Sequence, residues 1–338
     1  MKIAIVGGGA MGTLLGAHLC ADHSVSIVDL DARCRYIRAN GLRLLKPDGG
    51  ILQENPVLVT DNYAIVGPQD YVLLTVKAYD LPRVAEDIGH LLNKDTVVVT
   101  IQNGIPWWYF QKYPGQFENL RLESVDPLNN LRKKINVDQI VGCVAYPAAE
   151  LLDDGLVRHV EGYRFPVGEL DGQVLERTVN LVKLFEQAGF KSRAVSDIRS
   201  EYWLKAWGAL SINPISALTH GEMDAICSHK LTKSLVENMM KEAAEVANSF
   251  GVTFRHTIDK RIEGARNVGP HKTSMLCDLE AGRQLEIEAL IGSIVELAKV
   301  AGQPIPSIQA IYACISLLNE RSKKVNLQMD TAYLCAAG

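Results

Sequence analysis

The chain lacks a long hydrophobic run, an excess of one charge and a paired cysteine motif. No apolar segment of its 338 residues reaches the roughly 20 residues that a membrane-spanning helix needs. The net charge of −4 gives no electrostatic footprint for nucleic acid or anionic lipid. The seven cysteines are scattered, with no C-x-x-C pair and no histidine at metal-ligand spacing. We therefore expect no membrane span, no nucleic-acid partner and no metal site, and a small molecule as the ligand.

The most specific motif lies at the start of the chain. An apolar β-type run, 2–6, is followed by glycines in G-x-G-x-x-G spacing and then by a helix-compatible segment, 13–20. This is a dinucleotide-binding signature, in which the glycines permit a tight turn, close approach of a pyrophosphate and close helix packing. The helix N-terminus then favours the phosphate charge. We expect the cofactor to contact Gly7, Gly9, Ala10, Met11 and Gly12.

An acidic residue follows the second expected strand. The run 25–28 ends in Asp29, about 20 residues after the glycines, where a carboxylate can accept hydrogen bonds from an adenosine ribose. A carboxylate repels the 2′-phosphate of NADP, so the local chemistry favours NAD, although Arg33 or Arg35 could reach that phosphate if the loop curls back. The first 20 residues also resemble a signal peptide, but such segments seldom hold four glycines so close together, and we expect a cytoplasmic protein.

Further strand-like runs predict an α/β fold with a Rossmann-type, doubly wound parallel sheet. The runs 71–76, 97–101 and 140–146 are apolar without alternation and are separated by segments of mixed polarity, as in strands covered on both faces. Lys77 and Asn103 follow two of these runs, at the sheet edge where ligands bind.

The second half of the chain is expected to be mainly α-helical. The runs 156–160 and 163–167 suggest a hairpin that extends the sheet, and helical periodicity then dominates, most clearly over 231–250 and 283–301. We expect a dinucleotide-binding domain over 1–195, a helical substrate domain over 196–325 and a tail over 326–338. The excursion 105–136 begins with aromatic residues 107–110, for which core packing is the favoured interpretation.

Four polar residues of the helical half are candidates for chemistry. Lys205 lies in an otherwise apolar segment, 201–214, where the alternative to catalysis is a stem that reaches solvent. Asn213 lies about 80° around and roughly 12 Å along a helix from it, so both can flank one elongated pocket. Ser274 and Glu286 belong to a polar stretch that leads into the expected helix 283–301.

Taken together, these motifs resemble the ketopantoate reductase family, the 2-dehydropantoate 2-reductases. The likeness covers nearly the whole chain. It rests on the three glycines, Val76-Lys77, Gln102-Asn103-Gly104, the segment 205–214 and Thr273-Ser274-Met275-Leu276 followed by Glu286. The resemblance implies NAD(P)H-dependent reduction of a 2-oxo acid, ketopantoate or a related substrate, within pantothenate biosynthesis, by an enzyme that is expected to be a homodimer.

The resemblance also implies roles for individual residues. Lys205 would be the general acid, a role that suits an ammonium because it stabilises the oxyanion and supplies the proton. Glu286 would orient Lys205 or the substrate hydroxyl. The substrate would be bound by Asn213 and Ser274, and the cofactor by Lys77 and Asn103.

Two positions depart from the family pattern. Ala209 stands where family members typically have a second asparagine, so a different 2-oxo acid is an open alternative. Family members that use NADP often carry an arginine after the second strand, whereas this chain has Asp29-Leu30-Asp31; the family therefore favours NADP and the local chemistry NAD. The other functions considered are a related NAD(P)-dependent hydroxy-acid dehydrogenase and a non-catalytic NAD(P)-binding redox sensor.

Overall fold

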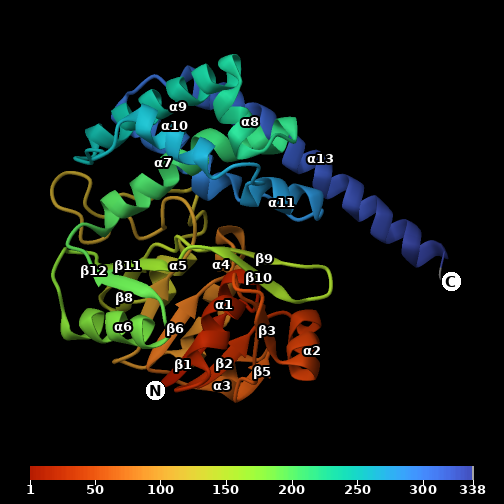
Figure 1. Ribbon diagram of the computed structural model, residues 1–338. Helices are drawn as coiled ribbons and strands as arrows, with labels where there is room; N and C mark the ends of the chain where they lie inside the picture. The colour runs from red at the N-terminus through yellow and green to blue at the C-terminus, as the bar shows by residue number, and fades with distance from the viewer. Residues whose placement is uncertain (337–338) are drawn as a thin grey trace. The chain divides into compact units, whose positions relative to one another are not determined.

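The computed structural model describes residues 1–336, and side chains through residue 322. It divides into two compact units, Met1–Glu201 and Tyr202–Gly338, and the sheets lie in the first unit while the second is helical (Figure 1). The expected α/β class with a second, mainly helical part is confirmed. The domain limits 195 and 325 stay predictions. Helix α13 continues to Ala336 and so covers most of the expected tail 326–338, and residues 337–338 lie outside the described residues.

The first unit is built on an eight-stranded sheet in the order β12-β11-β8-β7-β6-β1-β2-β5. Every neighbouring pair is parallel except β8 and β11. From the central β1 the chain builds β2 and β5 on one side and then returns to add β6 on the other, so β1 and β6 flank the topological switch point. The strands are β1 Lys2–Val6, β2 Ser24–Val28, β5 Leu58–Thr60, β6 Tyr71–Leu74, β7 Val97–Thr100, β8 Ile140–Cys143, β11 Arg164–Glu169 and β12 Lys191–Ala194.

Helices cover both faces of this sheet, as the apolar, non-alternating strands predicted. In β1, Ile3 and Ile5 belong to the core cluster shared with α1 and α6, while Ala4 and Val6 point to the opposite face and are equally buried. Successive side chains of a strand alternate between faces, so β1 needs cover on both. The helices of this unit are α1 Ala10–Leu19, α2 Asp31–Asn40, α3 Tyr63–Val66, α4 Leu81–Asp87, α5 Asn130–Lys134 and α6 Glu176–Gln187, with short 3-10 turns η1 Ala78–Asp80, η2 Ile88–Leu91 and η3 Val137–Gln139.

A second, four-stranded sheet corrects the expected hairpin. Its order is β4-β3-β10-β9, with β3 Leu42–Leu45, β4 Ile51–Glu54, β9 Ala148–Leu151 and β10 Val157–Glu161. Strand β10 pairs with β9 and β3, whereas β11 pairs with β8 and β12. The hairpin of 156–160 with 163–167 is therefore wrong, because the chain turns at Gly162, with φ +80°, and passes from one sheet to the other. Helix α1 contacts strands of both sheets.

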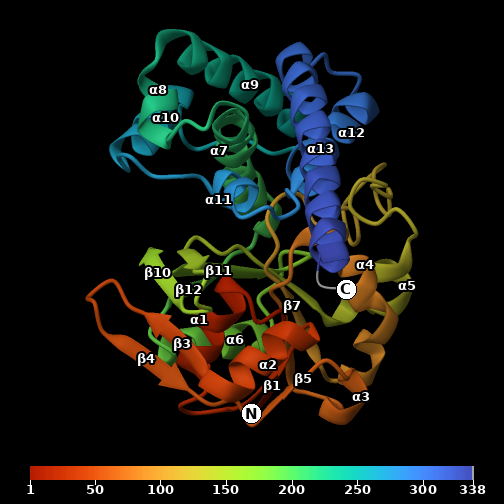
Figure 2. The same cartoon turned by 90° about the vertical axis from the view of Figure 1, so that its right-hand side faces the viewer.

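The second unit consists of helices packed around α9. Trp207 of α7 donates from its indole Nε1 to Met240 O of α9 at 2.7 Å, and Phe254 stacks on the Trp207 ring with centroids 4.0 Å apart. The helices are α7 Ile198–Thr219, α8 Met223–Ser228, α9 Lys230–Ser249, α10 Ile258–Asn267, α11 Ser274–Glu280, the π-helical turn η4 Glu288–Gly292, α12 Ser293–Ala301 and α13 Pro306–Ala336. Figure 2 shows α9 and α13 from the side.

The expected helix 283–301 begins later than predicted. Residues 283–286 have no helical hydrogen bonding, and the helix opens with the π-helical turn η4 before α12. Leu285 N instead donates to Asn319 Oδ1 of α13 at 3.0 Å. This tertiary bond replaces the first helical turn, so the apolar periodicity placed the helix start too early. The expected helix 231–250 is confirmed by α9.

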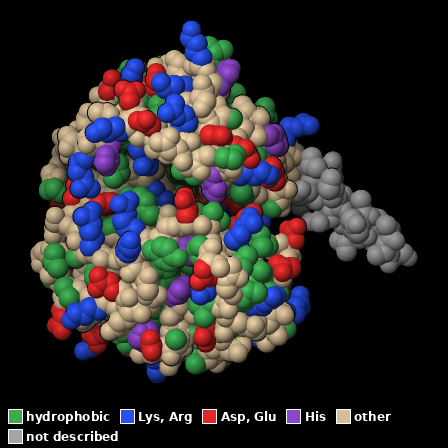
Figure 3. Space-filling view, viewed as in Figure 1, with side chains coloured by type: hydrophobic (Ala, Val, Ile, Leu, Met, Phe, Trp, Pro, Cys, Tyr) green, Lys and Arg blue, Asp and Glu red, His purple; other side chains and the backbone are tan. Residues whose placement is uncertain are grey.

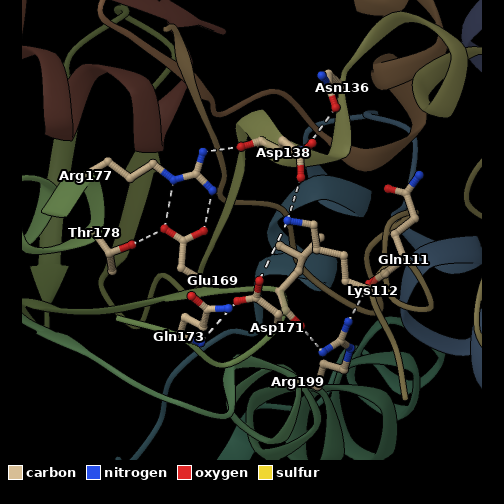
Figure 4. Close-up of polar contacts among 11 residues, drawn as sticks. Gln111, Lys112, Asn136, Asp138, Glu169, Asp171, Gln173, Arg177, Thr178 and Arg199 are labelled. Carbon is tan, nitrogen blue, oxygen red and sulfur yellow. Dashed lines mark hydrogen bonds and ion pairs between the residues drawn. The ribbon is translucent and has the colours of Figure 1, made fainter. Parts of the chain in front are cut away.

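The excursion 105–136 packs its aromatic residues inside the first unit. Trp107, Trp108, Tyr109 and Phe110 are at most 3% exposed, which confirms core packing. Arg199 holds this segment by donating to Tyr109 O, Gln111 O and Leu170 O at 2.5–2.7 Å. Figure 4 shows Arg199 together with Lys112, which forms an ion pair with Asp138 at 2.7 Å. The guanidinium of Arg199 and the ammonium group of Lys112 thus anchor the excursion 105–136.

The visible surface carries charges of both signs. Acidic and basic side chains are both present over the visible part of each unit in Figure 3. Among the residues that the structure describes, no helix combines the length and the apolarity needed to cross a bilayer.

Candidate functional site

The glycine turn after β1 has the geometry of a dinucleotide cradle. Gly7 has φ +106°, and a Cβ there would lie 2.8 Å from Val76 N, so only glycine fits. A Cβ on Gly12 would lie 1.7 Å from Gly7 O, which shows how closely α1 approaches the turn. At Gly9, by contrast, a Cβ would meet no atom within 4 Å. The side of the turn that a pyrophosphate would approach is therefore open, and these residues fit the cofactor.

Asp29 and Arg33 fix this turn from the next strand and helix. Asp29 follows β2 and accepts hydrogen bonds from Gly8 N at 2.5 Å and from Leu30 N at 2.6 Å. Arg33 of α2 donates to Gly8 O at 2.7 Å, to Thr13 Oγ1 at 3.0 Å and to Gly155 O at 3.1 Å. Burial lowers the pKa of the Arg33 guanidinium from its ordinary value. Arg33 thus braces the turn against the β9–β10 loop.

Lys77 and Asn103 lie at the carboxyl edge of the same sheet, beside the switch point. The end of β6 packs directly on Gly7, and Thr75 Oγ1 donates to Gly7 O at 2.7 Å. Gln102 Nε2 donates to Leu74 O at 2.8 Å, which ties the end of β7 to the end of β6. These contacts gather the glycine turn, Lys77 and Asn103 at neighbouring strand ends. Their roles toward a cofactor stay predictions.

A cavity of about 260 Å³ in the second unit brings Lys205 and Asn213 together. Both lie on α7, and both are partly buried. Their shared cavity is the arrangement that the eight-residue spacing predicted. The remaining lining is Gly208, Ala209, Ile212, Met223, Arg261, Gly264, Ala265 and Val268. An ammonium and an amide that line one small cavity can bind two oxygens of one small polar molecule.

Arg261 of α10 is a lining residue that the sequence interpretation missed. Its Nη2 donates to Leu204 O of α7 at 3.3 Å. A Cβ at Gly208 would lie 3.0 Å from the same Nη2 and 3.5 Å from Nε, so the missing side chain at this position makes room for the guanidinium. A glycine inside an apolar helix costs about 0.5–1 kcal/mol. Gly208 was therefore the one sequence signal of a close approach to α7.

Ser274 and Glu286 do not line this cavity, although both belong to the second unit. Ser274 is the exposed first residue of α11, behind the cap at Thr273, whose Oγ1 accepts from Leu276 N at 3.2 Å. Glu286 is 6% exposed and lies two residues before the start of η4. Their predicted roles toward substrate and Lys205 stay predictions. Within the described chain, no group of three His, Cys, Asp or Glu side chains is placed to hold a metal ion.

Comparison with known proteins identifies the family. The model of ketopantoate reductase PanE/ApbA matches residues 3–172, and the model of the ketopantoate reductase PanE/ApbA C terminal matches 197–319. The chain belongs to the ketopantoate reductase family. The 2-dehydropantoate 2-reductase of Mesorhizobium japonicum (strain LMG 29417 / CECT 9101 / MAFF 303099) is 44% identical over 94% of this chain and 98% of its own length.

Solved structures agree with this family assignment. A candidate ketopantoate reductase from Ralstonia solanacearum MolK2 superposes with a TM-score of 0.90 at 33% identity, covering 95% of this chain and 98% of the other. D-mandelate dehydrogenase, solved with NADH and anilino(oxo)acetate, has a TM-score of 0.80 at 20% identity, with 95% and 99% of the two chains covered. The latter likeness concerns the fold alone. A nicotinamide dinucleotide cofactor follows from membership of the ketopantoate reductase family, and the geometry of the glycine turn fits it.

Proposed function

We propose that this ketopantoate reductase family member catalyses the NAD(P)H-dependent reduction of ketopantoate, or of a closely related 2-oxo acid, to the 2-hydroxy acid. The observation that carries the proposal is the α7 cavity, where Lys205 and Asn213 line one small space. The relative at 44% identity is a 2-dehydropantoate 2-reductase. A hydroxy-acid dehydrogenase or a redox sensor has no comparable support.

In the proposed reaction, Lys205 supplies the proton. A nicotinamide dinucleotide held by the glycine turn would supply the hydride that adds to the ketone carbon, and the carbonyl oxygen would then carry the electron pair of an alkoxide. The Lys205 ammonium stabilises that negative charge and transfers a proton to it, which leaves a hydroxyl group and a neutral amine. Asn213 holds a second substrate oxygen, and Glu286 orients Lys205 or the substrate hydroxyl. Ser274 is assigned to substrate binding from the family resemblance.

We further propose that NADH is the preferred cofactor. Asp29 is held at the end of β2 by two backbone N–H groups, where its carboxylate suits a ribose diol and repels a 2′-phosphate. Neither nearby arginine is placed to compensate the repulsion between Asp29 and a 2′-phosphate. Arg33 is bonded to the glycine turn, and Arg35 pairs with Asp31 at 2.8 Å. Gly7, Gly9 and Gly12, with Ala10 and Met11, would hold the pyrophosphate. Lys77 and Asn103 would hold the nicotinamide half.

The test of the proposed function is Lys205→Ala. Positioned general acids contribute about 10²- to 10⁴-fold to rate, so kcat for ketopantoate should fall by roughly that factor, while the Kd for NADH stays unchanged because the glycine turn is intact. Stopped-flow and steady-state absorbance of NADH measure both. Lys299→Ala, on the exposed end of α12, is the matched control. Normal turnover of 2-oxo acids by Lys205→Ala would contradict the assignment of Lys205 as the general acid.

The remaining expectations rest on family membership, except the location, which rests on the glycine-rich start of the chain. Pantothenate biosynthesis, a homodimeric assembly and a cytoplasmic location belong to the same proposal.

A further inference from the structure

The charges around the α7 cavity indicate how a substrate carboxylate is recognised. Lys205 and Arg261 are its two charged lining residues, both are cationic, and the lining includes no carboxylate. A 2-oxo acid carries an anionic carboxylate directly beside its ketone. Building on the proposed function, we propose that Arg261 binds the substrate carboxylate, while Lys205 faces the ketone oxygen. Arg261 is then a residue that determines substrate specificity.

The position of the guanidinium supports this assignment. Arg261 Nη2 lies between Leu204 O, at 3.3 Å, and the site of the absent Cβ of Gly208, at 3.0 Å. Leu204 and Gly208 are one helical turn apart, and Lys205 is on the intervening turn. The guanidinium thus lies against the turn of α7 that carries Lys205, and both residues line the same cavity. Its planar fork of N–H donors matches the two oxygens of a carboxylate, which a single ammonium does not.

Arg261 also accounts for Ala209. A neutral amide at position 209 is unnecessary where a guanidinium makes the stronger, charge-assisted contact with the carboxylate. Ala209 then joins Ile212, Met223 and Ala265 in an apolar wall that can contact the carbon substituents of the substrate. The cavity volume of about 260 Å³ is below the roughly 300–1,000 Å³ of sites for drug-sized ligands. The expected class of substrate is therefore a short 2-oxo acid with one carboxylate.

The experiment compares Arg261→Gln with the wild type on two substrates, ketopantoate and its neutral amide. Removing a charge-assisted contact should raise KM for ketopantoate by about 10- to 100-fold, with kcat and the KM for NADH changed less than about threefold. For the amide, which has no anionic group, the two proteins should differ by less than about threefold. Arg261→Lys should recover part of the lost affinity because it keeps the charge without the fork.

Two further variants separate recognition from folding. Arg266→Gln removes an exposed arginine five residues further along α10, whose ion pair with Glu263 is 3.7 Å long, and should leave both KM values unchanged. Gly208→Ala places a methyl group against Nη2 and should raise KM for ketopantoate in the wild type but not in Arg261→Gln.

Melting temperatures of all variants show whether the fold is retained. A KM for ketopantoate within twofold of wild type in folded Arg261→Gln would overturn the proposal, as would an equal loss for acid and amide.

The proposed function and this inference can fail separately. If the wild type reduces ketopantoate but Arg261→Gln does so with an unaltered KM, only the inference fails. If the wild type reduces no 2-oxo acid, the proposed function fails, and calorimetric titration of ketopantoate and its amide then tests Arg261 without turnover. Selective loss of ketopantoate binding in Arg261→Gln would still support the inference, and equal binding by both proteins would refute it.

Discussion

At the scale of single residues, two side chains beside the glycine turn bear on the proposed cofactor preference. Asp29 accepts from Gly8 N and Leu30 N, so its carboxylate is held where an adenosine ribose would lie. Arg33 donates to Gly8 O and Thr13 Oγ1, so its charge braces the protein. The sequence predicted the acidic residue from its spacing, but it could not show that Arg33 is engaged by the turn, because that depends on contacts with Gly155 and Thr13.

Replacement of Asp29 by Ser should reverse the cofactor preference. Hydrogen bonds to charged groups contribute about 1.5–3 kcal/mol, so kcat/KM with NADH should fall by roughly 10- to 100-fold. The same value with NADPH should rise, because the like charge facing the 2′-phosphate is removed. Initial rates with each cofactor at saturating ketopantoate measure this change.

The control for Asp29 lies two residues further on. Asp31 is exposed and pairs with Arg35 at 2.8 Å, so Asp31→Ser should leave both values within about twofold. Asp29→Asn keeps an acceptor for Gly8 N and separates the loss of charge from a disturbed turn. A wild type that uses NADPH better than NADH would contradict the proposed preference.

At the scale of elements, a buried ion pair joins the last residue of β11 to the first turn of α6. Glu169 is 2% exposed, and it accepts from Arg177 Nε at 2.9 Å, from Arg177 Nη2 and from Thr178 Oγ1 (Figure 4). The hydrogen bond to Glu169 raises the pKa of Arg177. Because Arg177 also donates to Asp138 O, the pair fixes the end of β11, α6 and η3 to one another.

Arg177→Met should destabilise the first unit far more than loss of a surface arginine. Removing one partner of a buried pair leaves an uncompensated charge and costs about 3–5 kcal/mol; the lower end applies because the Arg177 side chain is 24% exposed. Urea unfolding followed by circular dichroism measures this free energy.

Matched variants show whether pairing is the cause. The double variant Glu169→Gln/Arg177→Met should lose less stability than Arg177→Met alone, since no unpaired carboxylate remains buried. Arg35→Met, which breaks an exposed pair within α2, should cost only about 0.5 kcal/mol. If Arg177→Met and Arg35→Met are equally stable, the buried pair does not hold these elements together.

Helices and strands were predicted correctly where a local sequence pattern defines them. They were predicted poorly where their position depends on contacts between residues far apart in the sequence. The glycine spacing and the apolar run 25–28 identified β1, α1 and β2, and helical periodicity identified α9. The pairing of β10 with β3 joins residues more than 100 positions apart, and no turn signal reports it. The start of η4 depends on the bond of Leu285 to Asn319, which is also a tertiary contact that no local pattern reports. The sequence did not predict that Arg261 lines the cavity for the same reason, because its contact with Leu204 is also tertiary.

At the scale of the whole molecule, the glycine turn and the α7 cavity belong to different units. The first unit, Met1–Glu201, contains the glycine turn and both sheets, and the second, Tyr202–Gly338, contains the α7 cavity. Sequence patterns predicted this division, with the glycine motif in one half and Lys205 in the other. Stability and cofactor binding can therefore be perturbed in the first unit without touching the cavity residues.

Acidification should destabilise the molecule through His18 of α1. Burial lowers the pKa of His18 below its ordinary value of 6.5, with the charges of His159 and Lys46 acting in the same direction and a backbone hydrogen bond at Ala188 opposing them. The folded protein therefore binds fewer protons than the unfolded chain below pH 6.5, and the free energy of unfolding falls as the pH drops from there toward the folded pKa. The loss is at most about 1.4 kcal/mol per pH unit for one group.

Urea unfolding at pH 7.5 and pH 5.5 measures this effect. The Nε2 atom of His18 is buried without a hydrogen-bond partner among the described residues, and its ring packs on Phe190 with centroids 4.9 Å apart. His18→Gln cannot take up a proton, so it should show a smaller difference in stability between the two pH values than the wild type. His90→Gln, at an exposed position in η2, should retain the wild-type difference. If His18→Gln retains it as well, protonation of other groups causes the acid sensitivity, and the buried ring on α1 has no part in it.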